Sequence, residues 1–163
     1  MLQYLHPDPL GEMPNSTLPL IVAVAGIDPR LGEHAVHELL LGHGWEGTWT
    51  YTVYDYWHYH ATGHEVLVCI AGNARLGFGG DSGVAVEMRP GDAVIIPAGV
   101  GHKRLSGTAD FQVVGAYPPG QNGAITRAGA IDLVVAARAI GQLELPETDP
   151  LSGEAPGRLA AWR

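Results

Sequence analysis

The stretch WHYHATGHEVLVCIAG, residues 57–72, gathers the side chains of this chain that are best suited to chemistry. His58 and His60 are two positions apart, so in a β-strand their side chains lie on the same face. Four residues separate His60 from Glu65, which opens the apolar run EVLVCIA. Two imidazoles and a carboxylate from neighbouring strands form a donor set that suits a divalent transition metal. The sequence therefore predicts a metal site.

The elements that must position these residues are mostly strands. From Trp45 onward the pattern of apolar residues has a period of two, and the segments are separated by turn sequences such as ATG, AGN, GGDSG and PAGVG. Short strands at this spacing favour an all-β sandwich or barrel. We expect strands at about 48–60, 64–71, 73–78, 84–89, 92–96, 102–105 and 111–117.

The flanks of this β region differ in character. Four prolines in residues 1–19 indicate an extended arm, and Leu20 to Ala25 is typical of a strand. Helical stripes of apolar residues predict helices over 30–41 and 129–141. We therefore expect one domain in three parts: an arm, strand and helix in 1–44, a barrel in 45–120, and a helix and tail in 121–163.

Composition excludes several classes of protein. A formal charge of −8 over 163 residues, without a basic run, argues against nucleic-acid and anionic-membrane binding. The single cysteine, Cys69, lies in an apolar run and is expected to be a core residue. The N-terminal residues lack the pattern of a signal peptide, and the apolar run LPLIVAVAGI is too short to span a bilayer. We expect a cytoplasmic protein.

Residues 52–72 resemble the first sequence motif of the cupin superfamily, G(x)5HxH(x)3–4E(x)6G. Here the motif is His58-x-His60-x4-Glu65-x6-Gly72, and its leading glycine position holds Thr52.

The second cupin motif, G(x)5PxGxxH(x)3N, is matched by residues 91–106. It is Gly91-x5-Pro97-x-Gly99-x2-His102, and the final asparagine position holds Ser106. The segments PLIVAVAG, GWEGTW, PAGVGHK and DFQVVGAYPPGQ are also similar to the small YjlB-like subgroup of cupins. A turn at Pro97 and Gly99 would bring His102 to the start of the next strand, pointing into the barrel.

The resemblance implies a fold and a metal site. It implies a cupin double-stranded β-helix, a jelly-roll barrel of two antiparallel sheets, with an N-terminal arm and flanking helices. It further implies one divalent transition metal, Fe, Mn, Ni or Zn, held near one mouth by His58, His60, Glu65 and His102. Such a ligand set leaves positions open for water and substrate.

His64 is an alternative to Glu65 as the fourth ligand. The spacing from His60 allows either residue, whereas the six-residue gap to Gly72 favours Glu65. Adjacent residues of a strand point to opposite faces, so both are not expected to bind the same ion unless a bulge intervenes. We expect Glu65 to be the ligand and His64 to lie at the rim or behind the ligands.

Alternation along the strands predicts which other residues reach the pocket. Tyr54 and Tyr56 share the face of His58, and Arg104 shares that of His102. Tyr56 and His64 are candidate proton carriers, and Arg104 is a candidate substrate anchor. The outward-facing residues would be Trp45, Trp49, Trp57 and Tyr59.

These outward aromatic side chains need covering, either by the N-terminal arm and helices or by a second subunit. Single-domain cupins are commonly dimers, so the resemblance implies a homodimer.

Two functions are compatible with these residues. One is a metal-dependent enzyme of the oxygenase, isomerase or decarboxylase type, acting on a small polar metabolite. The other is a non-catalytic cupin that binds or senses a small molecule through the same pocket. The fold does not decide between them, because one fold supports many chemistries.

Overall fold

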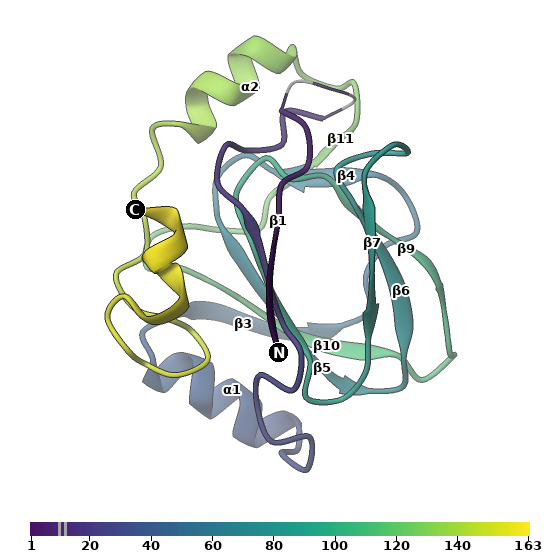
Figure 1. The fold of residues 1–163 in the computed structure, drawn as a ribbon, viewed down its shortest axis with the longest axis vertical. Helices are drawn as coiled ribbons and strands as arrows, with labels where there is room; N and C mark the ends of the chain where they lie inside the picture. The colour runs from purple at the N-terminus through teal and green to yellow at the C-terminus, as the bar shows by residue number, and fades with distance from the viewer. Residues whose placement is uncertain (10, 12) are drawn as a thin grey trace.

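The computed structural model describes residues 1–9, 11 and 13–163, and two antiparallel β-sheets form its body (Figure 1). The larger sheet has six strands in the order β1-β2-β8-β5-β10-β3. Its strands are β1 (Leu2–Leu5), β2 (Leu20–Ala23), β8 (Ala93–Ile96), β5 (Glu65–Ala71), β10 (Gln112–Tyr117) and β3 (Glu46–Tyr51).

The smaller sheet has five strands in the order β11-β4-β9-β6-β7. Its strands are β11 (Ile125–Arg127), β4 (His58–His60), β9 (His102–Gly107), β6 (Ala74–Phe78) and β7 (Val84–Met88). Apolar side chains from both sheets fill the space between them, among them Leu67 and Val113 from the larger sheet and Leu76 and Phe78 from the smaller. Cys69 belongs to this buried core, as expected. The predicted all-β jelly roll is confirmed.

A second apolar layer covers the outer face of the six-stranded sheet. Helix α1 (Glu33–Gly42) and the C-terminal 3-10 helix η1 (Gly157–Trp162) lie along this face (Figure 1), and Leu40 and Trp162 are buried against strand residues such as Ile95. Helix α2 (Leu133–Ile140) packs elsewhere, where its Ile140 joins Met13 and Tyr59.

Most predicted elements are present, but one prediction was wrong. The expected strand 48–60 is two strands, β3 and β4, which belong to different sheets and are joined by the irregular segment 52–57. Strands β1 and β11 were not expected as strands. They extend the two sheets with residues from outside 45–120, so the arm and the C-terminal part contribute directly to the β-structure.

The large aromatic residues divide between the two sides of the sheets. Trp45 lies in the outer layer, and its indole Nε1 donates to the carbonyl of Thr148 at 2.8 Å. Tyr59 is covered by the N-terminal arm and α2. Trp49 was expected on the outside and instead lines the internal cavity described below, because the irregular segment after β3 changes the alternation.

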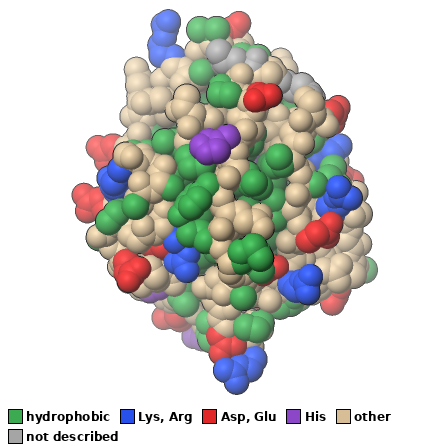
Figure 2. Space-filling model, viewed as in Figure 1, with side chains coloured by type: hydrophobic (Ala, Val, Ile, Leu, Met, Phe, Trp, Pro, Cys, Tyr) green, Lys and Arg blue, Asp and Glu red, His purple; other side chains and the backbone are tan. Residues whose placement is uncertain are grey.

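No helix in the described part of the chain is long and apolar enough to cross a membrane. Figure 2 shows acidic and basic side chains scattered around the margin of one face, with hydrophobic side chains nearer its centre. The acidic excess of the sequence therefore forms no large patch of one sign on this face.

Candidate metal centre

Four buried polar residues meet between the two sheets. His58 and His60 lie on β4, and His102, the first residue of β9, stands opposite His58 in the antiparallel pair. Glu65 is the first residue of β5 and reaches in from the other sheet. All four residues are less than a tenth exposed. The fold thus unites residues that are up to 44 positions apart in the sequence, counting from His58 to His102.

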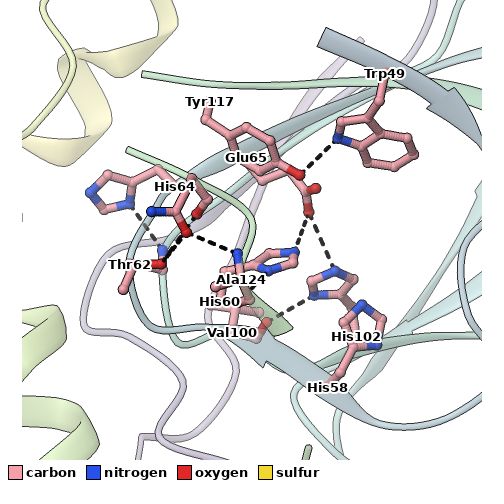
Figure 3. Close-up of polar contacts among 12 residues, drawn as sticks. Trp49, His58, His60, Thr62, His64, Glu65, Val100, His102, Tyr117 and Ala124 are labelled. Atoms are coloured by element: carbon pink, nitrogen blue, oxygen red, sulfur yellow. Dashed lines mark hydrogen bonds and ion pairs between the residues drawn. The ribbon is translucent and has the colours of Figure 1, made fainter. Parts of the chain in front are cut away.

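The three imidazoles form a compact group. One ring nitrogen from each of His58, His60 and His102 lies within 4.8 Å of the corresponding atoms of the others. The Glu65 carboxylate contacts two of these rings, with Oε2 at 3.0 Å from Nε2 of His60 and 3.4 Å from Nε2 of His102. Figure 3 shows the carboxylate directed at these two rings. The three imidazoles thus form one group, and the carboxylate lies beside two of them.

The hydrogen bonds of the three Nδ1 atoms show that the histidines are oriented in a way that fits a metal. In each ring Nδ1 faces a backbone carbonyl, which can only accept a hydrogen bond, so Nδ1 carries the proton. In a neutral imidazole Nε2 is then left with a lone pair, which is the arrangement found in metal-binding histidines. The acceptors for His58, His60 and His102 are the carbonyl oxygens of Tyr56, Ala124 and Val100, at 2.9, 3.2 and 3.0 Å respectively.

The charges in this group are strongly coupled. Burial, together with the neighbouring His102, lowers the pKa of His58 to about 3, so this ring is neutral. Burial also opposes a charge on His60, but the Glu65 carboxylate outweighs it and raises the pKa of His60. Burial disfavours the Glu65 anion as well, yet the charge of His60 and the hydrogen bonds from His102 and His60 hold its pKa below the usual range. Glu65 is therefore an anion, and the ring of His60, whose pKa it raises, is the positive partner beside it.

A cavity of about 320 Å³ opens above the four residues. Its wall includes Trp49, Tyr51, Tyr54 and Tyr117, together with apolar side chains such as Leu67. A volume of this size suits a small molecule. The four polar residues form the part of its wall with the strongest metal-binding chemistry.

Trp49 and Tyr117 form a fixed pair in this wall. The indole Nε1–H of Trp49 donates to the phenol oxygen of Tyr117 at 2.7 Å, beside the Glu65 carboxylate (Figure 3). Burial raises the pKa of Tyr117, and the negative charge of Glu65 raises it further, so the phenol keeps its proton. A side chain at Gly115 would collide with Trp49, since an added Cβ would lie 2.3 Å from the indole ring.

Tyr56 and Arg104, the two other residues expected in the pocket, are not among those that line it. The ring of Tyr56 lies under the guanidinium of Arg127, whose carbon is 3.9 Å from the ring centre. Nε of Arg104 donates to the carbonyl of Val53 at 3.1 Å. Both placements follow from the irregular segment 52–57, which breaks the alternation before His58 and lies over the start of β9.

His64 also points away from the cluster (Figure 3). Its Nδ1 accepts the backbone N–H of Ala98 at 2.9 Å, and its ring lies 4.9 Å from that of Trp162. Burial lowers the pKa of His64 to about 4, so the ring is neutral. His64 and Glu65 thus face opposite sides of the sheet, and only Glu65 contacts the histidine cluster.

The turn before His102 depends on a residue that the sequence did not single out. Asn15 is buried, and its Oδ1 accepts the backbone N–H of Gly101 at 3.2 Å. Its amide Nδ2 donates to the carbonyls of Asp8 and Gly79 at 2.7 and 3.1 Å. Gly99 in the same turn has a φ of +89°, which only glycine adopts readily. The N-terminal arm therefore helps to place His102.

Comparison with known proteins supports the family resemblance. The family model described as "Cupin domain" matches residues 46–115 of this chain. The uncharacterized protein YjlB of Bacillus subtilis (strain 168) is 40% identical over 161 residues, a match that covers 98% of this chain and 94% of the relative.

Solved structures show weaker similarity. The DMSP lyase DddQ from Ruegeria pomeroyi DSS-3 gives a TM-score of 0.41 at 16% identity, covering 71% of this chain and 45% of that one. An oxalate decarboxylase structure gives 0.40 at 20% identity, covering 90% and 38% respectively. This chain spans less than half the length of either protein.

Proposed function

The chain belongs to the cupin family, and we propose that it is a metal-dependent enzyme that acts on a small polar metabolite. One divalent transition ion, Fe, Mn, Ni or Zn, would be held by His58, His60, His102 and Glu65. The observation that carries the proposal is the orientation of the three imidazoles. Each Nδ1–H is engaged by a backbone carbonyl, which turns each Nε2 inward. Nε2 of His60 and of His102 faces the Glu65 carboxylate, and a bound ion would take the place of the protons between them.

When bound, such an ion would polarise an oxygen-bearing group of the metabolite, or support chemistry with O2 if it is iron. The protein's own residues supply the surroundings. The carboxylate of Glu65 offsets part of the positive charge of the ion. The pair of Trp49 and Tyr117 forms a rigid wall, and the protonated phenol of Tyr117 can donate a hydrogen bond to a bound oxygen.

One observation favours a second candidate, a non-catalytic cupin that binds or senses a small molecule. His64, the histidine of residues 57–72 outside the proposed ligand set, turns away from the cavity. No imidazole beyond the proposed ligands lines the cavity among the described residues. Tyr117 or water would then have to transfer protons, whereas many enzymes position a histidine or a carboxylate for this step. A binding module needs no such group.

The homodimer and the cytoplasmic location predicted from the sequence belong to this proposal as well. Light scattering of the purified protein would measure the oligomeric state. A molecular mass equal to that of one chain, 17.2 kDa, at micromolar concentration would contradict the dimer.

The central test is the metal content and its consequence. The protein is purified without oxygen, its metals are identified by elemental analysis, and O2 uptake and product formation are measured with a panel of small metabolites. We expect about one transition ion per chain, lost in His102→Ala and retained in His34→Ala, a control on the exposed side of α1. Turnover in the loaded protein supports the enzyme, whereas binding without turnover across the panel supports the second candidate. Full occupancy in His102→Ala would contradict the ligand set.

A further inference from the structure

Besides the proposed metal ligands, four large aromatic side chains among the described residues line the cavity. Trp49, Tyr51, Tyr54 and Tyr117 all line it, and they come from β3, the segment that follows it, and β10. Tyr51 and Tyr54 stand at the mouth, where they are 56% and 40% exposed. Tyr117 lies deeper, with its ring centre 6.1 Å from that of His60. Aromatic rings therefore line the path from solvent to the histidines of the proposed metal site.

These rings also contact one another and the histidines. The ring centres of Tyr51 and Tyr54 are 6.1 Å apart, and the ring of Tyr54 meets His58 edge-on at 5.7 Å. The hydrogen bond between Trp49 and Tyr117 and the close approach of Gly115 fix the inner part of the wall. A wall held in this way offers its aromatic surface with little conformational cost on binding.

The charges at the cavity are unusual for a site that takes an aliphatic polycarboxylate. None of the described lining residues is lysine or arginine, and Glu65 is the acidic one among them. Two arginines near the cavity are not among the residues that line it: Nε of Arg104 donates to the carbonyl of Val53, and Arg127 lies over the ring of Tyr56. A second carboxylate on a ligand would therefore find no cationic partner in this wall.

From these observations we infer that the site takes a planar aromatic ligand whose ring bears an oxygen-donor group for the metal. The inference rests on the proposed function and names its substrate class. The ring would pack against the aromatic wall, and its oxygen atoms would point to the imidazoles. An organic cation would also favour aromatic faces. However, a divalent ion with one carboxylate ligand keeps a net positive charge and repels such a cation.

Two hydroxamates provide a matched test. Benzohydroxamate and acetohydroxamate present the same two oxygen donors to a metal and differ in carrying a phenyl or a methyl group. Their affinities for the chain loaded with Zn(II) are measured by calorimetry, with choline as a third ligand. Burial of the ring and its contact with the aromatic wall should make benzohydroxamate bind at least about tenfold more tightly than acetohydroxamate.

Variants of the wall should remove this preference without removing the metal. In Tyr54→Ala, and separately in Tyr51→Ala, we expect the ratio of the two affinities to fall by about threefold or more. The chain should still bind about one zinc ion, and the affinity for acetohydroxamate should change less than that for benzohydroxamate. Tyr4→Ala is the matched control, since Tyr4 is 45% exposed on β1 and is not among the residues that line the cavity. It should leave every value as in the native chain.

The results test the metal site and the aromatic substrate class separately. Equal affinity for the two hydroxamates, or tighter binding of choline than of benzohydroxamate, would overturn the aromatic substrate class while zinc uptake upholds the metal site. If zinc does not bind, the proposed function fails, and the substrate class that rests on it is overturned as well.

Discussion

The carboxylate of Glu65 lies 3.0 Å from Nε2 of His60, although the two residues belong to different sheets. Only five positions separate them in the sequence, and the turn at residues 61–64 carries the chain from one sheet to the other. This short crossing brings an anion into a cluster of imidazoles that would otherwise present neutral nitrogen donors alone. The negative charge of the site thus comes from Glu65, the first residue of β5.

Replacing Glu65 by glutamine should weaken metal binding while the fold is retained. The amide keeps the shape of the side chain but removes the negative charge that complements a divalent ion. We expect the affinity for the ion to fall by more than about tenfold, as measured by competition with a chelator. Glu87→Gln is the control, because Glu87 is exposed on β7. An unchanged affinity in Glu65→Gln would exclude Glu65 as a ligand.

Replacing His64 by alanine should lower the stability of the fold and leave metal binding unchanged. The change removes the acceptor of the buried Ala98 N–H and the ring that packs on Trp162. We expect the free energy of unfolding to fall by about 1–3 kcal/mol, as determined by urea denaturation. The metal content should equal that of the native chain. A folded His64→Ala protein that had lost its metal would show that His64, rather than Glu65, completes the site.

The comparison of these two neighbours shows what the sequence could predict. The spacing of the two motifs pointed to His58, His60 and His102, and period-two alternation put Glu65 and His64 on opposite faces. The histidine ligands were implied by the resemblance to the cupin motifs, whereas the opposite faces of His64 and Glu65 follow from a local rule that holds within a regular strand. The structure brings the three histidines together, and the contact of Glu65 with two of them follows the expected face.

The residues of the cavity wall were harder to predict. Alternation counted back from His58 selected Tyr56 and missed Trp49, because the chain leaves the β conformation between β3 and β4. Tyr117 gave no local signal, since its partner Trp49 is 68 positions away. Asn15 lies in a proline-rich arm, where a buried hydrogen-bonding role depends wholly on tertiary contacts. Long-range pairing of this kind is not contained in periodicity or spacing.

Asn15 offers a test of the support behind His102. Asn15 has a φ of +49°, a left-handed conformation that glycine tolerates, so Asn15→Gly removes the amide without backbone strain. The backbone groups of Gly101, Asp8 and Gly79 then lose their partner, and we expect a loss of about 1–3 kcal/mol in the free energy of unfolding.

Metal affinity should fall in the same variant, because the turn that carries His102 is loosened. Asn15→Ala adds strain at the left-handed position and should be less stable than Asn15→Gly by about 1 kcal/mol. Urea denaturation and chelator competition measure the two effects. Unaltered stability and metal affinity in Asn15→Gly would show that the arm does not support the site.

Asp149 should make stability depend on pH at the acidic end. It is fully buried and accepts hydrogen bonds from the backbone of Leu151 and from both the backbone and side chain of Arg158. Burial opposes its charge, but these bonds outweigh burial and lower the pKa of Asp149 below that of an ordinary aspartate. Its stabilisation is therefore complete above the unfolded pKa of about 3.9 and is lost as the pH falls through the lower folded value.

The variant Asp149→Asn measures this contribution. At pH 7 we expect its free energy of unfolding to be lower than that of the native chain by about 1–3 kcal/mol. The difference should shrink once the pH drops below about 4, as the native carboxylate also becomes protonated. Asp55→Asn, at an exposed position, should show neither effect. A difference that is constant from pH 7 to pH 3 would contradict the role of the charge.

The outer layer of the six-stranded sheet has a consequence for how the protein is made. Trp162 is buried there, and its indole Nε1 donates to the carbonyl of Pro19 at 2.9 Å, a bond that spans 143 positions. Strand β2, which follows Pro19, is therefore synthesised long before Trp162, the residue that helps to cover its outer face. Until synthesis passes that point, the nascent chain exposes an apolar sheet, which is a surface that chaperones recognise and that promotes aggregation.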